Sequence, residues 1–126
     1  MDLFWDRQKK RMEVLEWAAK FEDVEYRILA LDYDGERLMV STIWDGMQSP
    51  PSLFITPETA RVFETAVLRD GEIVESERYH SEDAAMEGHA EFCMKVLGRP
   101  PRPEDGHRET VIERERAAEK RRRDKD

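Results

Sequence analysis

The chain has 126 residues, of which 39% are hydrophobic and 40% charged, so it offers enough apolar material for one core and too little for two. Its 21 basic and 29 acidic side chains give a formal net charge of −8. No stretch approaches the roughly 18 consecutive apolar residues of a membrane span, the start lacks a secretory signal pattern, and a single cysteine excludes an internal disulfide. We therefore expect an acidic, soluble, cytoplasmic protein with one domain, over about residues 1–97.

The N-terminal segment favours a helix, because residues 3–20 contain good helix formers and neither glycine nor proline. Trp5, Met12, Leu15 and Ala19 fall near one stripe of the helical wheel, while the basic residues between them stay on the solvent side. This pattern predicts an amphipathic helix over about residues 3–20.

Two Asp-Gly pairs each lie between alternating apolar segments, which is a strong signal for a two-residue hairpin turn. The pair Asp34-Gly35 predicts a hairpin over about residues 25–44. The pair Asp70-Gly71 predicts a second hairpin over about residues 62–79. The two hairpins together predict a four-stranded antiparallel sheet.

The first turn also predicts a register for its hairpin. With two residues in the turn, Leu31 lies opposite Leu38 on one face. Asp32 then lies opposite Arg37 on the other face.

The C-terminal part of the domain reads as a helix over about residues 82–97, with Ser81 as its N-cap and acidic residues in its first turn. The fold class is therefore α+β, with this helix packed on one face of the sheet. Residues 98–107 contain three prolines and predict a linker. Residues 108–126 form a charged tail, either a solvated helix or disordered.

Several motifs resemble those of a set of small uncharacterised proteins from actinobacterial phages and their hosts. The motifs are Val40-Ser41-Thr42-Ile43-Trp44-x-Gly46, Phe63-Glu64-Thr65 and Ala84-Ala85-x-x-Gly88-His89. The resemblance spans roughly residues 17–93 and implies a phage-type protein acting in the host cytoplasm. It implies no biochemical activity.

The second hairpin suggests a cluster of carboxylates. Its register places Glu64 opposite Glu77, with Glu75 on the same face. If the cluster is functional, it is a divalent-cation site or an acidic contact surface for a basic partner. Otherwise it is a solvated face on which nearby arginines screen the negative charges. The arginines in question are Arg27, Arg61 and Arg78.

Two further features suggest contacts with a macromolecule. Trp44 precedes a loop that contains Pro50 and Pro51, so it either anchors a partner or closes the end of the core. The tail holds a basic run that could contact phosphates or remain solvated. That run is Lys120, Arg121, Arg122 and Arg123.

His89 and Cys93 are four residues apart on the predicted C-terminal helix, a spacing that could supply two metal ligands or a Cys-His pair. The sequence shows no clear third ligand, so we interpret both as buried structural residues. No metal, cofactor or catalytic residue is expected.

The leading hypothesis is a small non-enzymatic accessory or binding protein of phage type that contacts another macromolecule. The expected partner is a protein, with a host protein as one candidate. One alternative is a metal- or small-ligand-dependent protein centred on Glu64, Glu75, Glu77 and His89. Another is a nucleic-acid-associated protein that uses the basic tail. The sequence predicts no membrane contact and does not predict an oligomeric state.

Overall fold

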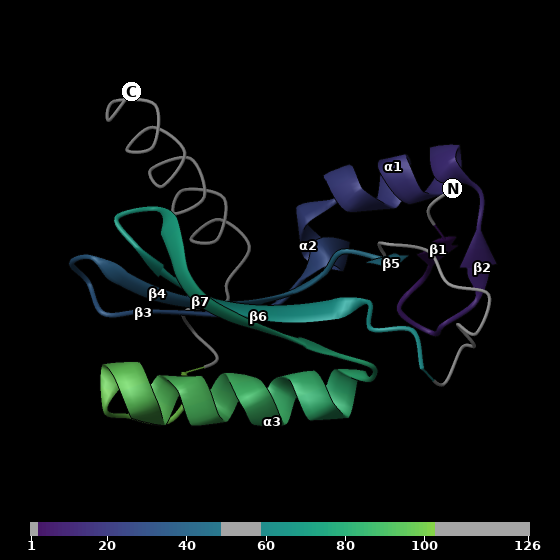
Figure 1. Cartoon of the computed structure of the whole chain (residues 1–126). Coiled ribbons are helices and arrows are strands. Elements are labelled where there is room, and N and C mark those ends of the chain that lie inside the picture. Colours follow the sequence, from purple (N-terminus) through teal and green to yellow (C-terminus); the bar gives the residue numbers. More distant parts are fainter. Residues whose placement is uncertain (1–2, 49–58, 103–126) are drawn as a thin grey trace.

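The computed structural model describes residues 3–48 and 59–102. Its main layer is a four-stranded antiparallel sheet in the order β3-β4-β6-β7, and helix α3 (Glu82–Phe92) covers one face of it (Figure 1). The strands are β3 (Ile28–Tyr33), β4 (Leu38–Trp44), β6 (Phe63–Arg69) and β7 (Glu72–Tyr79). The predicted α+β fold, with two hairpins and a helix on one face, is confirmed.

A second, smaller sheet lies beside one end of the main sheet (Figure 1). Its strands, in the order β2-β1-β5, are β1 (Leu3–Trp5), β2 (Arg11–Met12) and β5 (Met47–Gln48). Helix α1 (Val14–Glu22) and the short helix α2 (Val24–Arg27) follow β2.

The predicted helix over residues 3–20 is wrong in its first half, because the chain forms the β1-β2 ribbon there and α1 begins only at Val14. Asp6 produces the turn: its carboxylate accepts hydrogen bonds from the backbone N–H groups of Gln8 and Lys10, both at 2.9 Å. Trp5 and Met12 are buried from these strands, whereas α1 buries no residue completely. Core burial has outweighed local helix propensity in this segment.

The first hairpin forms, but the predicted register is wrong. Tyr33 pairs with Met39, so the connection is longer than the two residues expected from Asp34-Gly35. The Asp34 carboxylate accepts hydrogen bonds from three successive backbone N–H groups, including that of Arg37 at 2.9 Å, and this widens the turn. As a result Asp32 lies opposite Val40 on the face that α3 covers, and not opposite Arg37.

The second hairpin has the expected two-residue turn, with positive φ at Asp70 (53°) and Gly71 (83°). A β-bulge near Val67 then adds one residue to β7 and shifts the rest of the register. Glu64 consequently lies opposite Arg78, and the predicted pairing of Glu64 with Glu77 is wrong.

Helix α3 has the predicted N-cap, because the Ser81 Oγ accepts a hydrogen bond of 3.0 Å from the Ala84 N–H. The helix continues as one wider π-helical segment, η1 (Cys93–Leu97), and stops at Gly98, whose φ is +70°. The predicted extent of about residues 82–97 is therefore confirmed. Core side chains from the sheet and from α3 and η1 meet between the layers, among them Val40, Val67, Phe92 and Cys93.

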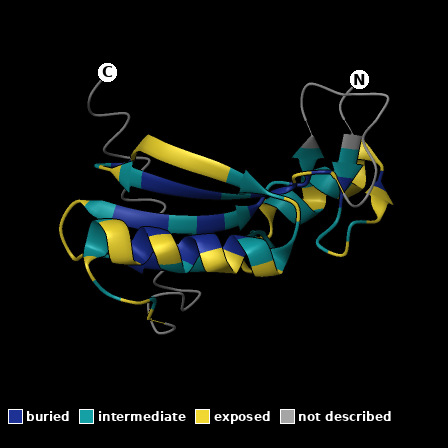
Figure 2. Cartoon of the chain, turned by 60° about the horizontal axis from the view of Figure 1, so that its bottom comes forward, coloured by how far each residue is buried: buried dark blue, intermediate teal, exposed yellow. Residues whose placement is uncertain are grey.

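The central strands of the main sheet are mostly buried, and its outer strand β7 is exposed along most of its length (Figure 2). Within the part of the chain that the structure describes, no helix is long and apolar enough to span a membrane. The tail from residue 108 lies outside the described residues.

Candidate functional site

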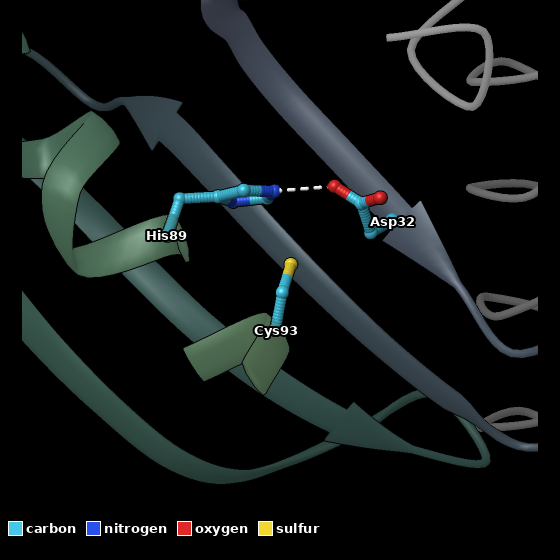
Figure 3. A group of neighbouring side chains, drawn as sticks. All are labelled: Asp32, His89 and Cys93. Atoms are coloured by element: carbon cyan, nitrogen blue, oxygen red, sulfur yellow. Dashed lines mark hydrogen bonds and ion pairs between the residues drawn. The ribbon is translucent and has the colours of Figure 1, made fainter. Parts of the chain in front are cut away.

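His89 lies at the centre of a buried group of hydrogen-bonded polar side chains. Its side chain points from α3 toward the sheet and is fully buried, with 0% exposure. Its Nε2 lies 2.6 Å from Oδ2 of Asp32 on β3, which is 1% exposed (Figure 3). Its Nδ1 lies 2.7 Å from Oγ1 of Thr42 on β4. Both ring nitrogens therefore have a hydrogen-bond partner from the sheet.

The hydrogen bonds continue across the sheet. Thr42 Oγ1 lies 2.6 Å from Oγ1 of Thr65 on β6, and the Thr65 hydroxyl also contacts the Ala85 carbonyl oxygen at 3.4 Å. Strands β3, β4 and β6 and helix α3 thus each contribute one side chain to this buried polar network, which consists of Asp32, Thr42, Thr65 and His89.

The other oxygen of Asp32 is held by the segment that follows η1. Arg99 Nη1 and the Arg102 backbone N–H each donate to Oδ1 at 2.8 Å. Arg99 Nη2 also donates to the Tyr33 carbonyl oxygen at 3.0 Å, next to Asp32 on the same strand. The first residues of the predicted linker are therefore docked on β3 and contribute to the site.

The electrostatics of the pair favour an ionised Asp32 and a neutral His89. Burial raises the pKa of Asp32, but the hydrogen bonds from Arg99 and His89 outweigh it, so this pKa lies below its ordinary value. Burial lowers the pKa of His89 below its ordinary value, because desolvation outweighs the attraction of the Asp32 carboxylate, and the charge of Arg99 acts in the same direction. A neutral imidazole can donate through only one of its two nitrogens at a time.

Cys93 completes a group of three potential ligands. One oxygen of Asp32, one nitrogen of His89 and the Cys93 sulfur all lie within 4.8 Å of one another (Figure 3). Cys93 is also fully buried, so the expectation of buried positions for both His89 and Cys93 is confirmed. Asp32 is the third potential ligand, which the sequence did not reveal because the predicted register paired it with Arg37 on the other face of the hairpin.

The three glutamates of the predicted cluster do not lie together. Glu64 pairs with Arg78 at 3.4 Å, and Glu75 pairs with Lys95 of η1 at 2.6 Å. In the observed register Glu75 and Glu77 lie on the α3 side of the sheet, whereas Glu64 lies on the opposite side. The prediction of a single carboxylate surface is wrong, because the β-bulge moves Glu64 out of register with the other two.

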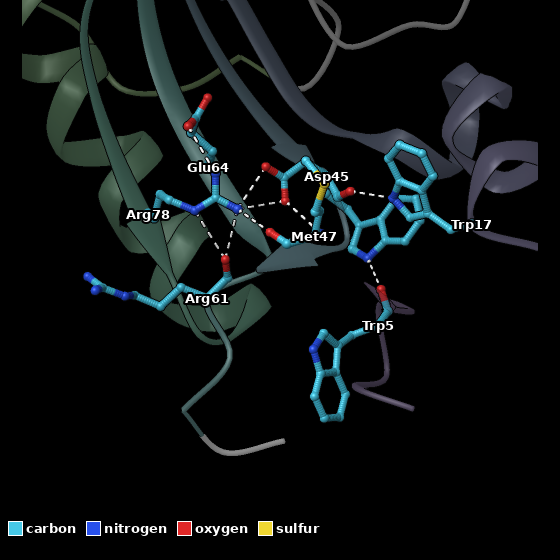
Figure 4. Close-up of polar contacts among 8 residues, drawn as sticks. Trp5, Trp17, Asp45, Met47, Arg61, Glu64 and Arg78 are labelled. Atoms are coloured by element: carbon cyan, nitrogen blue, oxygen red, sulfur yellow. Dashed lines mark hydrogen bonds and ion pairs between the residues drawn. The ribbon is translucent and has the colours of Figure 1, made fainter. Parts of the chain in front are cut away.

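Arg78 instead forms a clamp at the junction of the two sheets (Figure 4). Its Nη2 donates to the Asp45 carboxylate at 2.7 Å, to the Met47 carbonyl oxygen at 2.9 Å and to the Arg61 carbonyl oxygen at 2.9 Å. Burial raises the pKa of Asp45 above its ordinary value, although Arg78 opposes this. The clamp joins β5, β6 and β7 and has an architectural role.

Trp44 lies in the core beside this clamp and not on the surface. Its side chain is 0% exposed, and its Nε1 donates to the Trp5 carbonyl oxygen at 2.8 Å. The structure favours the interpretation that Trp44 closes the end of the core, and it contradicts an exposed anchor. Pro50 and Pro51 lie outside the described residues. So do the tail residues Lys120, Arg121, Arg122 and Arg123.

Comparison with known proteins gives no relative for this chain: no family model, no curated protein and no solved structure matches it. The resemblance to small phage proteins therefore stays a prediction from sequence patterns.

Proposed function

We propose that this protein is a non-enzymatic binding protein, and that the open edge of β7 binds an extended, basic segment of a partner protein. The observation that carries the proposal is the exposure of this edge strand. Residues 72–77 are all exposed, and they include the large apolar side chains Ile73 (59% exposed) and Val74 (57%). An extended peptide can add to such an edge through main-chain hydrogen bonds, with side chains giving specificity.

The opposite edge of the sheet is a poorer candidate. Within the described part of the chain, β3 and β7 are the two outer strands. The segment with Arg99 and Arg102 contacts the edge of β3 through Tyr33 and Asp32, so an incoming strand would have to displace it. No described strand lies on the outer side of β7.

The charge of β7 supports a basic partner. Glu72, Glu75 and Glu77 lie along this strand, on a chain whose formal net charge is −8. Glu75 pairs with Lys95, but both side chains are largely exposed, so this ion pair contributes little and a partner cation can replace it. The same glutamates would repel the β7 edge of a second copy, which disfavours self-association and selects for an oppositely charged strand.

The burial of the reactive side chains His89 and Cys93 supports a role in binding over one in catalysis. His89 and Cys93, which could serve as base and nucleophile, are both fully buried. Their packing between α3 and the sheet leaves a macromolecular substrate no direct route to them.

The test is the binding of synthetic peptides of about eight residues, the length of an ordinary strand. A peptide of alternating lysine and valine should bind, and its glutamate-valine counterpart should bind at least tenfold more weakly. Backbone amide exchange measured by NMR should slow along β7 in the complex. Equal affinity for both peptides, or protection elsewhere without protection of β7, would contradict the proposal.

Two variants sharpen this experiment. Val74→Lys places a like charge on the edge that would receive the lysine peptide, and it should weaken binding at least tenfold. Leu15→Lys is the matched control, because Leu15 on α1 is also an exposed large apolar residue but lies on another element. Equal effects of the two substitutions would indicate nonspecific electrostatic binding and would count against the β7 site.

A further inference from the structure

We propose that Asp32, His89 and Cys93 form a zinc-binding site between β3 and α3-η1. The three ligand atoms lie within 4.8 Å of one another, and all three side chains are buried. A carboxylate oxygen, an imidazole nitrogen and a thiolate sulfur are the donor types that proteins use for zinc. The thiolate disfavours magnesium and calcium, which prefer oxygen ligands.

The surroundings of the ligands match those of a metal site. Zinc-binding histidines and carboxylates are held by hydrogen bonds on their non-ligating atoms. Asp32 has this arrangement, because Arg99 and Arg102 hold Oδ1 and leave Oδ2 directed at His89. His89 has it as well, because Thr42 holds Nδ1 and leaves Nε2 directed at Asp32.

The geometry needs only a small adjustment to accept the ion. His89 Nε2 and Asp32 Oδ2 are 2.6 Å apart and now bond each other. Tetrahedral zinc with bonds of roughly 2.0–2.1 Å to nitrogen and oxygen places such donors about 3.3 Å apart. The two side chains must therefore separate by less than about 1 Å, and the ion then replaces the hydrogen bond between them.

Zinc binding shifts the proton of His89 from Nε2 to Nδ1 and removes the proton of Cys93. Without metal, the neutral imidazole donates from Nε2 to Asp32, and Nδ1 accepts from the Thr42 hydroxyl. With zinc on Nε2, the proton resides on Nδ1 and is donated to Thr42. Thr42 then donates to Thr65, and Thr65 donates to the Ala85 carbonyl oxygen, which lies 3.4 Å away. His89 keeps one proton throughout, and the Cys93 thiol releases one proton to solvent.

Of the three proposed ligands, Asp32 also lines a cavity of about 240 Å³, with Leu31, Met86 and Pro101 among the other lining residues. Water from this cavity can supply the fourth zinc ligand that three protein ligands leave open.

The first test uses the full chain, freed of metals with a chelator that is then removed, and titrated with Co²⁺ as a spectroscopic probe. Tetrahedral cobalt bound to a thiolate should give visible absorption bands and a sulfur-to-metal charge-transfer band at one ion per chain. Zn²⁺ should abolish these bands, and Mg²⁺ should not. Absence of the bands would overturn the proposal.

Single substitutions test which side chains bind or orient the metal. Cys93→Ser, a nearly isosteric change, should remove the charge-transfer band and weaken zinc binding at least tenfold. Thr42→Val removes the group that orients His89 and should weaken zinc binding by about 10–100-fold. His80→Gln is the matched control, because His80 lies in the exposed turn before α3, and it should change nothing. A band that survives Cys93→Ser or disappears in His80→Gln would overturn the assignment.

X-ray absorption on the wild-type protein tests the site even if the variants do not fold. X-ray absorption at the zinc edge should show one sulfur neighbour at roughly 2.3 Å together with nitrogen or oxygen neighbours. The chain has a single cysteine, so a thiolate neighbour at one zinc per chain identifies Cys93. A spectrum without sulfur, or one zinc shared by two chains, would contradict the site.

Discussion

The Tyr79 hydroxyl occupies the space that a side chain at position 88 would fill. A Cβ on Gly88 would lie well inside van der Waals contact with the Tyr79 oxygen and with the ring carbons next to it. The glycine therefore allows the Tyr79 ring of β7 to lie directly against α3, at the residue before His89.

Gly88→Ala should destabilise the protein. Alanine is favoured over glycine in a helix by about 1 kcal/mol, but here the Tyr79 ring must move away from α3. Overpacking of this kind typically costs about 1–3 kcal/mol, so we expect a net loss in the free energy of unfolding measured with urea. Glu87→Ala, on the exposed side of the same helix, serves as the control for helix propensity. A higher urea midpoint for Gly88→Ala would show that the ring adapts freely.

Substitution of Gly46 and of Gly98 by alanine should distinguish the effect of backbone strain from that of steric overlap. Gly46 has a φ of +68°, and a Cβ there would overlap the Trp44 ring and lie 2.9 Å from the Trp17 ring. Gly98 has nearly the same φ, +70°, but open space around it. Gly46→Ala should therefore lower the melting temperature clearly more than Gly98→Ala. Equal shifts in calorimetry would attribute the whole effect to the backbone.

Local sequence signals predicted the elements of the main sheet and of α3 well. The Asp70-Gly71 turn and the Ser81 cap act on adjacent residues, and the structure has both. The N-terminal ribbon escaped prediction although the hydrogen bonds of its Asp6 turn are local. The burial of Trp5, which favours strand over helix here, depends on contacts with distant segments.

The candidate site could not be predicted because it depends on strand register. The Asp34 carboxylate lengthens the first turn, and this places Asp32 opposite Val40 on the face that α3 covers, where the predicted register paired it with Arg37. The predicted position of Glu64 was wrong for the same reason. The single extra residue of the β-bulge shifts the register, so that Glu64 lies opposite Arg78. One signal was available: Asp32, Thr42 and Thr65 are polar residues within largely apolar strands, and buried polar groups of this kind need partners.

His89→Ala should be among the most destabilising substitutions in the chain. It leaves a cavity between α3 and the sheet, and it removes one hydrogen-bond partner from the buried Asp32 carboxylate. We expect a loss on the order of 3 kcal/mol in the free energy of unfolding, measured by chemical denaturation with a metal chelator present. In combination with Asp32→Asn the loss should be less than additive. Additive losses would show that the two side chains contribute independently.

Arg99→Met should destabilise the domain although Arg99 follows the last helix. The substitution keeps much of the side chain's length but removes the cation that neutralises Asp32 and bonds Tyr33. The pKa of Asp32 should rise, because the hydrogen bond from Arg99 is the largest influence that lowers it. Carbon-13 NMR of the Asp32 carboxyl can follow this change. An unchanged titration would show that the segment does not hold the carboxylate.

The stability of the metal-free protein should fall on mild acidification. The folded-state pKa of His89 lies below its ordinary value of 6.5, so below pH 6.5 the unfolded chain binds a proton that the folded chain does not. The free energy of unfolding is therefore fully retained above about pH 6.5 and decreases below it, by at most about 1.4 kcal/mol per pH unit for one proton. The depressed pKa of Asp32 adds a second loss below its ordinary value of 3.8. Melting curves of the wild type in chelator should show the first decrease, and His89→Gln should lack it. A decrease of the same size in His89→Gln would assign the acid sensitivity to other groups.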